Sequence, residues 1–178
     1  MSIKSTELRY GFVAILLHWT TAVLILVLIL SGFRADGMTD SVAKAGVLSL
    51  HVPLGISVFL LTLLRLVWWR VADRKPAPLP MPRWQDRSAH AIHVLFYVVI
   101  LGMGASGMAM LALSGAAPIL FGESSVALPD FHDFGPRAPH GLGAMVLVAM
   151  FVLHAGAALY HQLVKRDGLL SRMWFGRN

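Results

Sequence analysis

The sequence predicts an all-α integral membrane protein built as a four-helix bundle. Of its 178 residues, 57% are hydrophobic and 13% are charged, whereas a soluble domain carries about 25% charged residues. The apolar residues gather in four continuous runs, each longer than the roughly 20 residues that a helix needs to cross a bilayer. Continuous runs are typical of helices, and an open strand cannot satisfy its backbone in lipid. We therefore expect residues 1–178 to form one membrane domain.

The four expected spans follow one another along the chain. They cover residues 12–33, 46–69, 90–113 and 139–164. Lys4 and Arg9 precede the first span as they would in a signal peptide, but its apolar run is too long for a signal core. We therefore expect the first run to remain in the protein as a membrane span.

The second and third links between the spans differ in composition. The second link is interrupted by Pro76, Pro78, Pro80 and Pro82, which predict a short extended segment. The third link, residues 114–138, is rich in Gly, Pro and Asp and is the longest. It is therefore the best candidate for a contact surface outside the membrane.

Lysine and arginine are unevenly distributed, and this predicts the orientation. Only Arg34, Lys44 and Arg137 belong to the first and third links. The N-terminal segment, the second link with its flanks, and the C-terminal segment hold the other twelve: Lys4, Arg9, Arg65, Arg70, Arg74, Lys75, Arg83, Arg87, Lys165, Arg166, Arg172 and Arg177. By the positive-inside rule, both termini are expected in the cytoplasm. The same rule accounts for the net charge of +6 without a nucleic-acid partner.

Four histidines are expected to lie at two matched depths. His140 and His154 are 14 residues apart on the fourth span, which places them on faces within roughly 40° of each other and about 21 Å apart along the helix. His18 lies about two turns into the first span from the cytoplasmic side, level with His154. His51 lies near the external start of the second span, level with His140.

Matched histidine pairs inside a membrane predict metal ligation. A lone membrane histidine is more often a hydrogen-bonded core residue, but four at matched depths need a stronger reason, because buried polar groups are costly. Neutral imidazole is a good iron ligand, and a haem can take two of them as axial ligands. A closed zinc site needs four ligands close together, whereas two histidines on opposite sides leave room for a flat molecule. The pattern therefore favours two porphyrins over bare ions.

The chain contains no cysteine. This excludes disulfides, iron–sulfur clusters, thiolate-ligated haem and the covalent attachment of c-type haem. Any haem must therefore be bound non-covalently and held by other ligands.

Small residues lie near the candidate ligands. Gly55 follows His51 by one turn, and two runs follow the histidines of the fourth span: Gly141, Gly143 and Ala144, then Ala155, Gly156, Ala157 and Ala158. They could form walls close to a macrocycle, although ordinary helix packing explains them equally well. We attribute Gly102, Gly104 and Gly107 of the third span to helix packing.

Two arginines are candidate contacts for haem propionates. Arg65 follows His51 by 14 residues, so it should face the bundle near the cytoplasmic pair. The alternative is an arginine that snorkels to the surface beside Trp68 and Trp69. Arg137 precedes His140 by three residues and could serve the external haem in the same way.

Three further histidines lie near the cytoplasmic surface. His161 follows His154 by seven residues, and His90 and His93 open the third span at the same level. Their imidazoles could exchange protons with a quinone headgroup. Propionate contact and plain interfacial placement are the alternatives. His132, in the third link, has no specific role that we can assign.

These residues resemble the bacterial dihaem cytochrome b561 family over nearly the whole chain, in size, link lengths and motifs. The resemblance rests on Leu17-His18-Trp19, Leu50-His51-Val52 with Gly55, His90-Ala91-Ile92-His93, His140, and Leu153-His154-Ala155 with His161. It implies a four-helix bundle with two b haems. His18 and His154 would hold the haem near the cytoplasmic face, and His51 and His140 the periplasmic one.

The resemblance also implies a function. The family moves electrons across the bacterial inner membrane and exchanges them with ubiquinone, and some members are similar to a superoxide:ubiquinone oxidoreductase. In that scheme His161 matches a histidine implicated at the quinone site. A periplasmic redox partner in place of superoxide is an alternative.

The superoxide function conflicts with the charge of the external links. Their three cations face five carboxylates, Asp36, Asp40, Glu123, Asp130 and Asp133, so the net field should repel an anion. A local patch of Arg34, Lys44 and Arg137 could override this repulsion.

Two other functions remain open from the sequence. One is the membrane-anchor cytochrome subunit of a dehydrogenase or hydrogenase, with the same haems and a protein donor. The other is a histidine-lined transporter of metal ions or protons, although we find no carboxylate well inside a span.

Overall fold

Four long helices dominate the computed structural model, which describes residues 2–122 and 126–175. They are α1 (Phe12–Asp36), α2 (Ser41–Val67), α3 (Arg83–Ser114) and α5 (Arg137–Tyr160). The π-helical turns η1 (Trp68–Ala72) and η3 (His161–Lys165) extend α2 and α5. Glu123 and Arg177, which entered the charge comparison, lie outside the described residues. Within these residues the chain forms helices and no strand, so the all-α prediction is confirmed.

Each long helix is able to cross a bilayer. The four candidate spans are 25 to 32 residues long, and their most apolar windows have mean hydropathies between 2.1 and 2.6. At about 1.5 Å per residue, each exceeds the roughly 30 Å of a hydrocarbon core. Large apolar side chains such as Leu30 and Leu153 are 71% and 66% exposed, as expected for a surface that faces lipid.

Two helices begin at least five residues earlier than the apolar pattern predicts. α3 starts at Arg83, seven residues before the expected start at His90, and Pro82 stands at its N-cap, where a missing backbone N–H costs nothing. α2 starts at Ser41, where the Asp40 carboxylate accepts hydrogen bonds from the backbone N–H groups of Val42 and Ala43. The hydropathy pattern therefore predicts only the apolar part of each helix. It does not predict the polar turns at the N-termini of α2 and α3.

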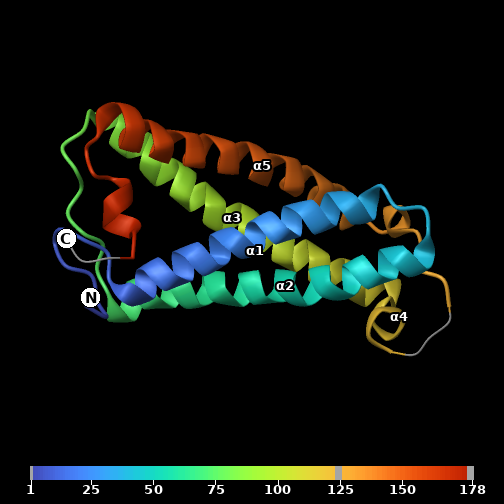
Figure 1. The fold of residues 1–178 in the computed structure, drawn as a ribbon. Coiled ribbons are helices and arrows are strands. Elements are labelled where there is room, and N and C mark those ends of the chain that lie inside the picture. The colour runs from blue at the N-terminus through green and yellow to red at the C-terminus, as the bar shows by residue number, and fades with distance from the viewer. Residues whose placement is uncertain (1, 123–125, 176–178) are drawn as a thin grey trace.

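The helices pack as two antiparallel pairs. α1 packs on α2, α3 packs on α5, and α2 joins the pairs by packing on α3. A buried cluster in the middle of the bundle takes one side chain from each helix: Ile25, Val58, Ile100 and Leu147. Figure 1 shows that both termini lie at one end. We call this the terminal end (residues 2–11, 73–82 and 166–175) and the opposite one the loop end (residues 37–40, 115–122 and 126–136).

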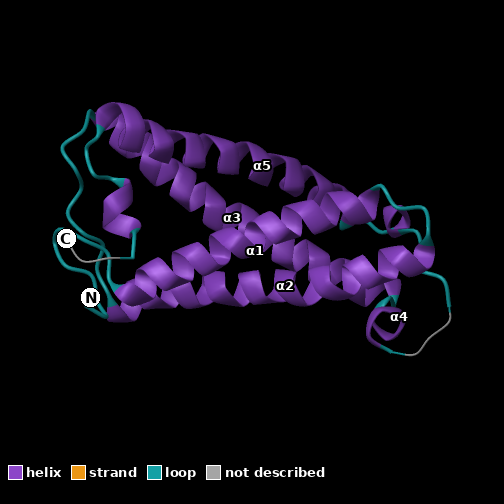
Figure 2. Ribbon diagram, in the orientation of Figure 1, coloured by secondary structure: helices purple, strands orange, loops and turns teal. Residues whose placement is uncertain are grey.

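The loop end carries two short helices, α4 (Ala117–Phe121) and the 3-10 helix η2 (Phe131–Asp133). The terminal end carries the 3-10 helix η4 (Leu170–Met173) and extended backbone, as the helix-and-loop colouring of Figure 2 shows. Residues 73–82 contain no helix, which agrees with the extended segment predicted from the four prolines.

Three segments are tied together at the terminal end. The Arg172 guanidinium donates hydrogen bonds to the carbonyl oxygens of Leu8 and Ala77, both at 2.7 Å. The Asp73 carboxylate accepts from Ser5, through its N–H at 3.0 Å and its hydroxyl at 2.8 Å, and from Trp68 Nε1. Burial alone would raise the pKa of Asp73, but these donors hold it below its ordinary value. We call this assembly the terminal cap.

Candidate functional site

Four histidines meet in two pairs inside the bundle. His18 of α1 and His154 of α5 have ring centres 6.2 Å apart, and the rings are inclined by 66°. His51 of α2 and His140 of α5 have ring centres 6.5 Å apart, inclined by 67°. Leu147 of the central cluster stands seven residues from both histidines of α5. The first pair therefore lies toward the terminal end and the second toward the loop end.

The ring separations fit two axial ligands of one metal ion. A metal–imidazole bond is about 2.0 Å and a ring centre lies about 1.2 Å beyond its nitrogen, so two rings across one ion have centres about 6.4 Å apart. Both measured separations are close to this value. No group of three or more His, Cys, Asp or Glu side chains among the described residues could hold a metal ion. Each pair therefore suits an iron whose other ligands come from a macrocycle.

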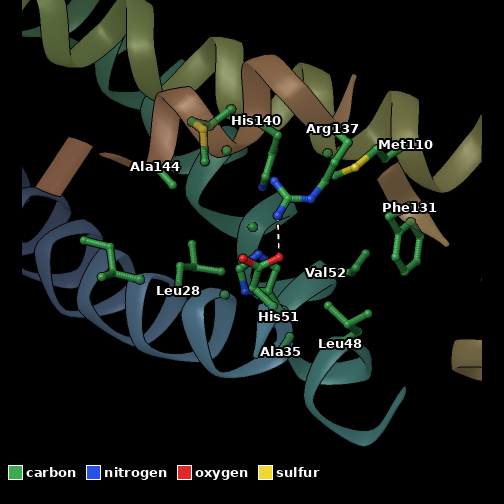
Figure 3. Close-up of a pocket in the computed structure, with 18 of the residues that line it drawn as sticks. Leu28, Ala35, Leu48, His51, Val52, Met110, Phe131, Arg137, His140 and Ala144 are labelled. Atoms are coloured by element: carbon green, nitrogen blue, oxygen red, sulfur yellow. Dashed lines mark hydrogen bonds and ion pairs between the residues drawn. The ribbon is translucent and has the colours of Figure 1, made fainter. Parts of the chain in front are cut away.

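A cavity of about 350 Å³ surrounds the loop-end pair. This volume lies within the range of about 300–1,000 Å³ that is usual for cofactor and ligand sites. Figure 3 shows His51, His140 and Arg137 converging on it, among apolar side chains such as Leu28 and Val52. An apolar cavity with a few converging polar groups fits a porphyrin better than a hydrated ion.

Each loop-end histidine lies within hydrogen-bond distance of a serine, and neither serine was predicted from the sequence. His51 Nδ1 lies 2.8 Å from the hydroxyl of Ser31 on α1. His140 Nδ1 lies 3.0 Å from the hydroxyl of Ser106 on α3. The dipeptide Ser-Gly occurs at both places, at 31–32 and 106–107, but it also occurs at 114–115, so this repeat alone does not single out the two serines.

Glycines adjoin the same two rings. A Cβ atom on Gly32 would lie 3.2 Å from His51 Cε1, and one on Gly107 would lie 3.3 Å from His140 Cε1. Both distances are tighter than ordinary contact. We had attributed Gly107 to helix packing, but the structure places it directly against a candidate ligand.

The terminal-end pair is surrounded by aromatic rings. His93 and Phe96 of α3 both have ring centres 5.4 Å from that of His154, and Trp19 lies 5.4 Å from His18. The structure thus brings His93 to the pair, although its side chain is exposed. His90 is exposed near the start of α3, and the structure does not bring it into either pair.

Arg65 points into the bundle at the terminal-end pair. Its Nη1 atom lies 3.4 Å from His18 Nδ1, and its guanidinium carbon lies 6.0 Å from the centre of the Tyr97 ring. Its Nε is buried and has no hydrogen-bond partner in the described part of the chain. A buried donor left unpaired costs free energy, so this geometry favours an acceptor from a bound group over snorkelling.

The two remaining predicted contacts are paired with carboxylates. Arg137 Nη2 forms an ion pair with Asp36 of α1, and both residues line the loop-end cavity. His161 Nδ1 lies 2.5 Å from Asp167 Oδ2 at the terminal end. Burial opposes the charged form of Asp167, but hydrogen bonds from His161 and from the Leu169 N–H lower its pKa. His132, which received no role, pairs with Asp130 on the exposed loop.

Known proteins resemble this chain along nearly its whole length. Residues 9–176 match the family model of prokaryotic cytochrome b561. The chain is 28% identical to cytochrome b561 homolog 2 of Escherichia coli (strain K12), over 97% of its own length and 95% of that protein. It is 33% identical to cytochrome b562 of Cereibacter sphaeroides, over 94% and 96% of the two chains. It is 29% identical to the probable superoxide oxidase CybB of Yersinia pestis, over 93% and 95%.

The family resemblance inferred from the histidine motifs is therefore confirmed. It implies binding of b-type haem, and with the four apolar helices it supports a multi-pass protein of a bacterial membrane. The chain, matched by the family model from residue 9 to residue 176, belongs to the prokaryotic cytochrome b561 family.

Proposed function

We propose that this membrane cytochrome carries electrons across the bilayer between two haems b. His18 and His154 would hold one haem at the terminal end, and His51 and His140 the other at the loop end. The observation that carries the proposal is the ring separation of 6.2 Å and 6.5 Å in two pairs on opposite sides of one apolar core. When bound, haem supplies one-electron exchange at each site.

The surrounding side chains suit the charges of two bound haems. The unpaired Nε of Arg65 is available to a propionate near His18. Arg137 could serve a propionate at the loop end, where Asp36 already holds its guanidinium in the cavity. The central cluster of Ile25, Val58, Ile100 and Leu147 places buried apolar side chains between the two sites.

We also propose that the terminal end faces the cytoplasm and exchanges electrons with a quinone. The distribution of twelve of fifteen cations supports the orientation. The His161–Asp167 pair supports the exchange, because an imidazole held by a carboxylate can pass protons to a reduced quinone. His93, exposed beside His154, is a second group that a quinone headgroup could meet.

Periplasmic superoxide is the electron donor that the charged residues lining the loop-end cavity favour. One relative is named a probable superoxide oxidase. Lys44 and Arg137 line the loop-end cavity, whereas Asp36 is the carboxylate that faces them and is paired with Arg137. The local charge at the cavity is therefore more favourable to an anion than the summed charge of the loops.

Haem stoichiometry tests the central proposal. Protein purified from cells supplied with haem should contain two haems b per chain by pyridine haemochrome spectra, and His18→Ala and His51→Ala should each contain one. His90→Ala, an exposed histidine that the structure brings into neither pair, is the control and should retain both. Porphyrin-free protein would overturn the proposal, and bound metal without porphyrin would favour a transporter.

Reconstituted vesicles test the partners. Protein in liposomes that contain ubiquinone should be reduced from the loop-end side by superoxide and should pass electrons to the quinone. Ascorbate, quinol and a copurified protein donor are the alternatives to compare. Reduction only by a copurified dehydrogenase would show a membrane-anchor subunit and would reject the superoxide proposal.

A further inference from the structure

The loop-end histidines are held by the same arrangement twice. Ser31 approaches His51 Nδ1 from α1, and Ser106 approaches His140 Nδ1 from α3, at 2.8 Å and 3.0 Å. The two serines lie on different helix pairs, and each is followed by a glycine. We call the dipeptides Ser31-Gly32 and Ser106-Gly107 the two Ser-Gly cradles.

The geometry of the serines favours one tautomer of each ring. Each hydroxyl lies within hydrogen-bond distance of the carbonyl oxygen three residues earlier, Leu28 O at 3.2 Å for Ser31 and Met103 O at 3.0 Å for Ser106, and we assign its single hydrogen to that carbonyl. Each oxygen therefore has only lone pairs to offer the imidazole. The ring must then donate from Nδ1–H, which leaves the lone pair of a neutral imidazole on Nε2.

The glycines determine how closely the ring can approach its helix. Added Cβ atoms would lie 3.2 Å and 3.3 Å from the Cε1 atoms of His51 and His140. Cε1 is the atom between the two ring nitrogens, so a side chain here would displace Nδ1 from the serine. Serine and glycine thus act on the same ring. The serine forms a hydrogen bond with it, and the glycine, which has no side chain, leaves room for it.

The terminal-end pair has a different arrangement. His18 Nδ1 faces Arg65 Nη1 at 3.4 Å, and a guanidinium can only donate. His18 Nδ1 is then the acceptor, and its proton lies on Nε2. Coordination of a metal through that nitrogen requires the contact with Arg65 to break and the proton to move.

We propose that the two Ser-Gly cradles are positioning elements that set the loop-end histidines for iron ligation through Nε2 before haem binds. The inference rests on the proposed function and extends it to residues outside the ligand set. A hydrogen bond from Nδ1–H also makes the ligand more basic, which stabilises ferric iron and lowers the midpoint potential of that haem.

Ordinary helical serines provide matched controls. Ser49 and Ser57 on α2 also bond to carbonyls of their own helix, Gly46 O at 2.9 Å and Pro53 O at 2.8 Å, and both bonds are exposed. A hydroxyl bonded to its own helix is therefore common. What distinguishes Ser31 and Ser106 is the imidazole on the other side of the oxygen.

The first test examines the protein before haem is added. Nitrogen-15 NMR of histidine-labelled apoprotein in detergent should show the Nδ1–H tautomer at His51 and His140, assigned with His51→Gln and His140→Gln. It should show the Nε2–H tautomer at His18. The Nε2–H tautomer at both loop-end histidines would overturn the proposal, whatever the haem content of the holoprotein.

The second test measures haem binding and redox potential. Ser31→Ala and Ser106→Ala should each weaken binding at one of two sites by about tenfold and raise one of the two midpoint potentials. Ser31→Thr and Ser106→Thr retain the hydroxyl and should restore both properties. Ser49→Ala and Ser57→Ala should leave both sites as in the wild type.

The outcomes separate this inference from the proposed function. Two haems with unchanged affinities and potentials in Ser31→Ala and Ser106→Ala would reject the cradles and leave the dihaem proposal intact. A wild-type protein without haem would reject the dihaem proposal itself. If an alanine variant fails to fold, Gly107→Ala in its place should still shift one potential, because it displaces the His140 ring.

Discussion

At the scale of single residues, each histidine pair depends on polar groups that the apolar bundle would otherwise exclude. Arg65 is the clearest case, because its Nε is buried without a hydrogen-bond partner among the described residues and its Nη1 contacts His18. A partly buried cation whose buried Nε has no acceptor is costly, and it is best explained by an anionic group that binds beside it. Arg65 is therefore expected to lower the stability of the apoprotein and to strengthen the binding of haem.

Replacement of Arg65 should separate these two effects. Arg65→Leu should weaken haem binding at the terminal end by about tenfold and lower the potential of that haem, because a positive charge near the iron is lost. The apoprotein should be no less stable in thermal unfolding, since an unpaired buried donor is removed. Haem titration, potentiometry and melting of the detergent-solubilised protein give the three readouts.

Arg70→Leu is the matched control, because Arg70 is exposed on η1 at the same end of the molecule. It should change none of these properties. Normal haem binding together with a destabilised apoprotein in Arg65→Leu would show that Arg65 is a structural residue only.

At the scale of helices, close packing between α2 and α3 joins the two helix pairs. A Cβ atom on Gly104 of α3 would lie 2.5 Å from Phe59 Cδ2 and 3.0 Å from Phe59 Cβ on α2. The same atom on Gly102 would meet nothing within 4 Å. Two glycines two residues apart on one helix therefore have different roles, and the sequence could not distinguish them.

Alanine at these two positions should have opposite effects on stability. Gly104→Ala should destabilise the protein by about 1–3 kcal/mol, because Phe59 must move in a packed contact. Gly102→Ala should be neutral or stabilising by about 0.5–1 kcal/mol, because alanine costs less backbone entropy in a helix. Denaturation of both variants in the same detergent provides the comparison.

Phe59→Ala, which opens space opposite Gly104, should reduce the additional cost of Gly104→Ala in the double variant. Equal effects of the two glycine substitutions would contradict the helix contact as described.

Much of the architecture could be predicted because membrane helices carry strong sequence signals. The spacing of His140 and His154, with the direction of each span, predicted which histidines share a depth. The approach of Ser31 and Ser106 could not be predicted, because it depends on how each helix is rotated about its axis. The early starts of α2 and α3 were missed because polar first turns give no apolar signal.

At the scale of the whole molecule, the terminal cap joins both termini to the proline-rich link. Asp73 accepts hydrogen bonds from Ser5, Trp68 and Arg74, and these donors outweigh burial and hold its pKa below the ordinary value. A carboxyl whose pKa is lower in the folded state contributes stability above its unfolded pKa of 3.8. This contribution is lost as the pH falls below that value.

Asp73→Asn should therefore lower the melting temperature at neutral pH and reduce the loss of stability between pH 5 and pH 3. Melting curves at several pH values in one detergent measure both effects. Asp133→Asn, on the loop end, is the control for loss of one carboxylate. A wild-type melting temperature with no more pH dependence than that of Asp73→Asn would contradict the role of Asp73 in the cap.

The charge distribution predicts the orientation of the whole molecule. With the terminal end in the cytoplasm, green fluorescent protein fused after residue 178 should be fluorescent, and alkaline phosphatase at the same place should be inactive. Phosphatase inserted in the exposed loop near Asp130 should be active in the periplasm. The reverse pattern would place the His51–His140 pair on the cytoplasmic side, and superoxide in the periplasm could then not reach the loop-end cavity directly.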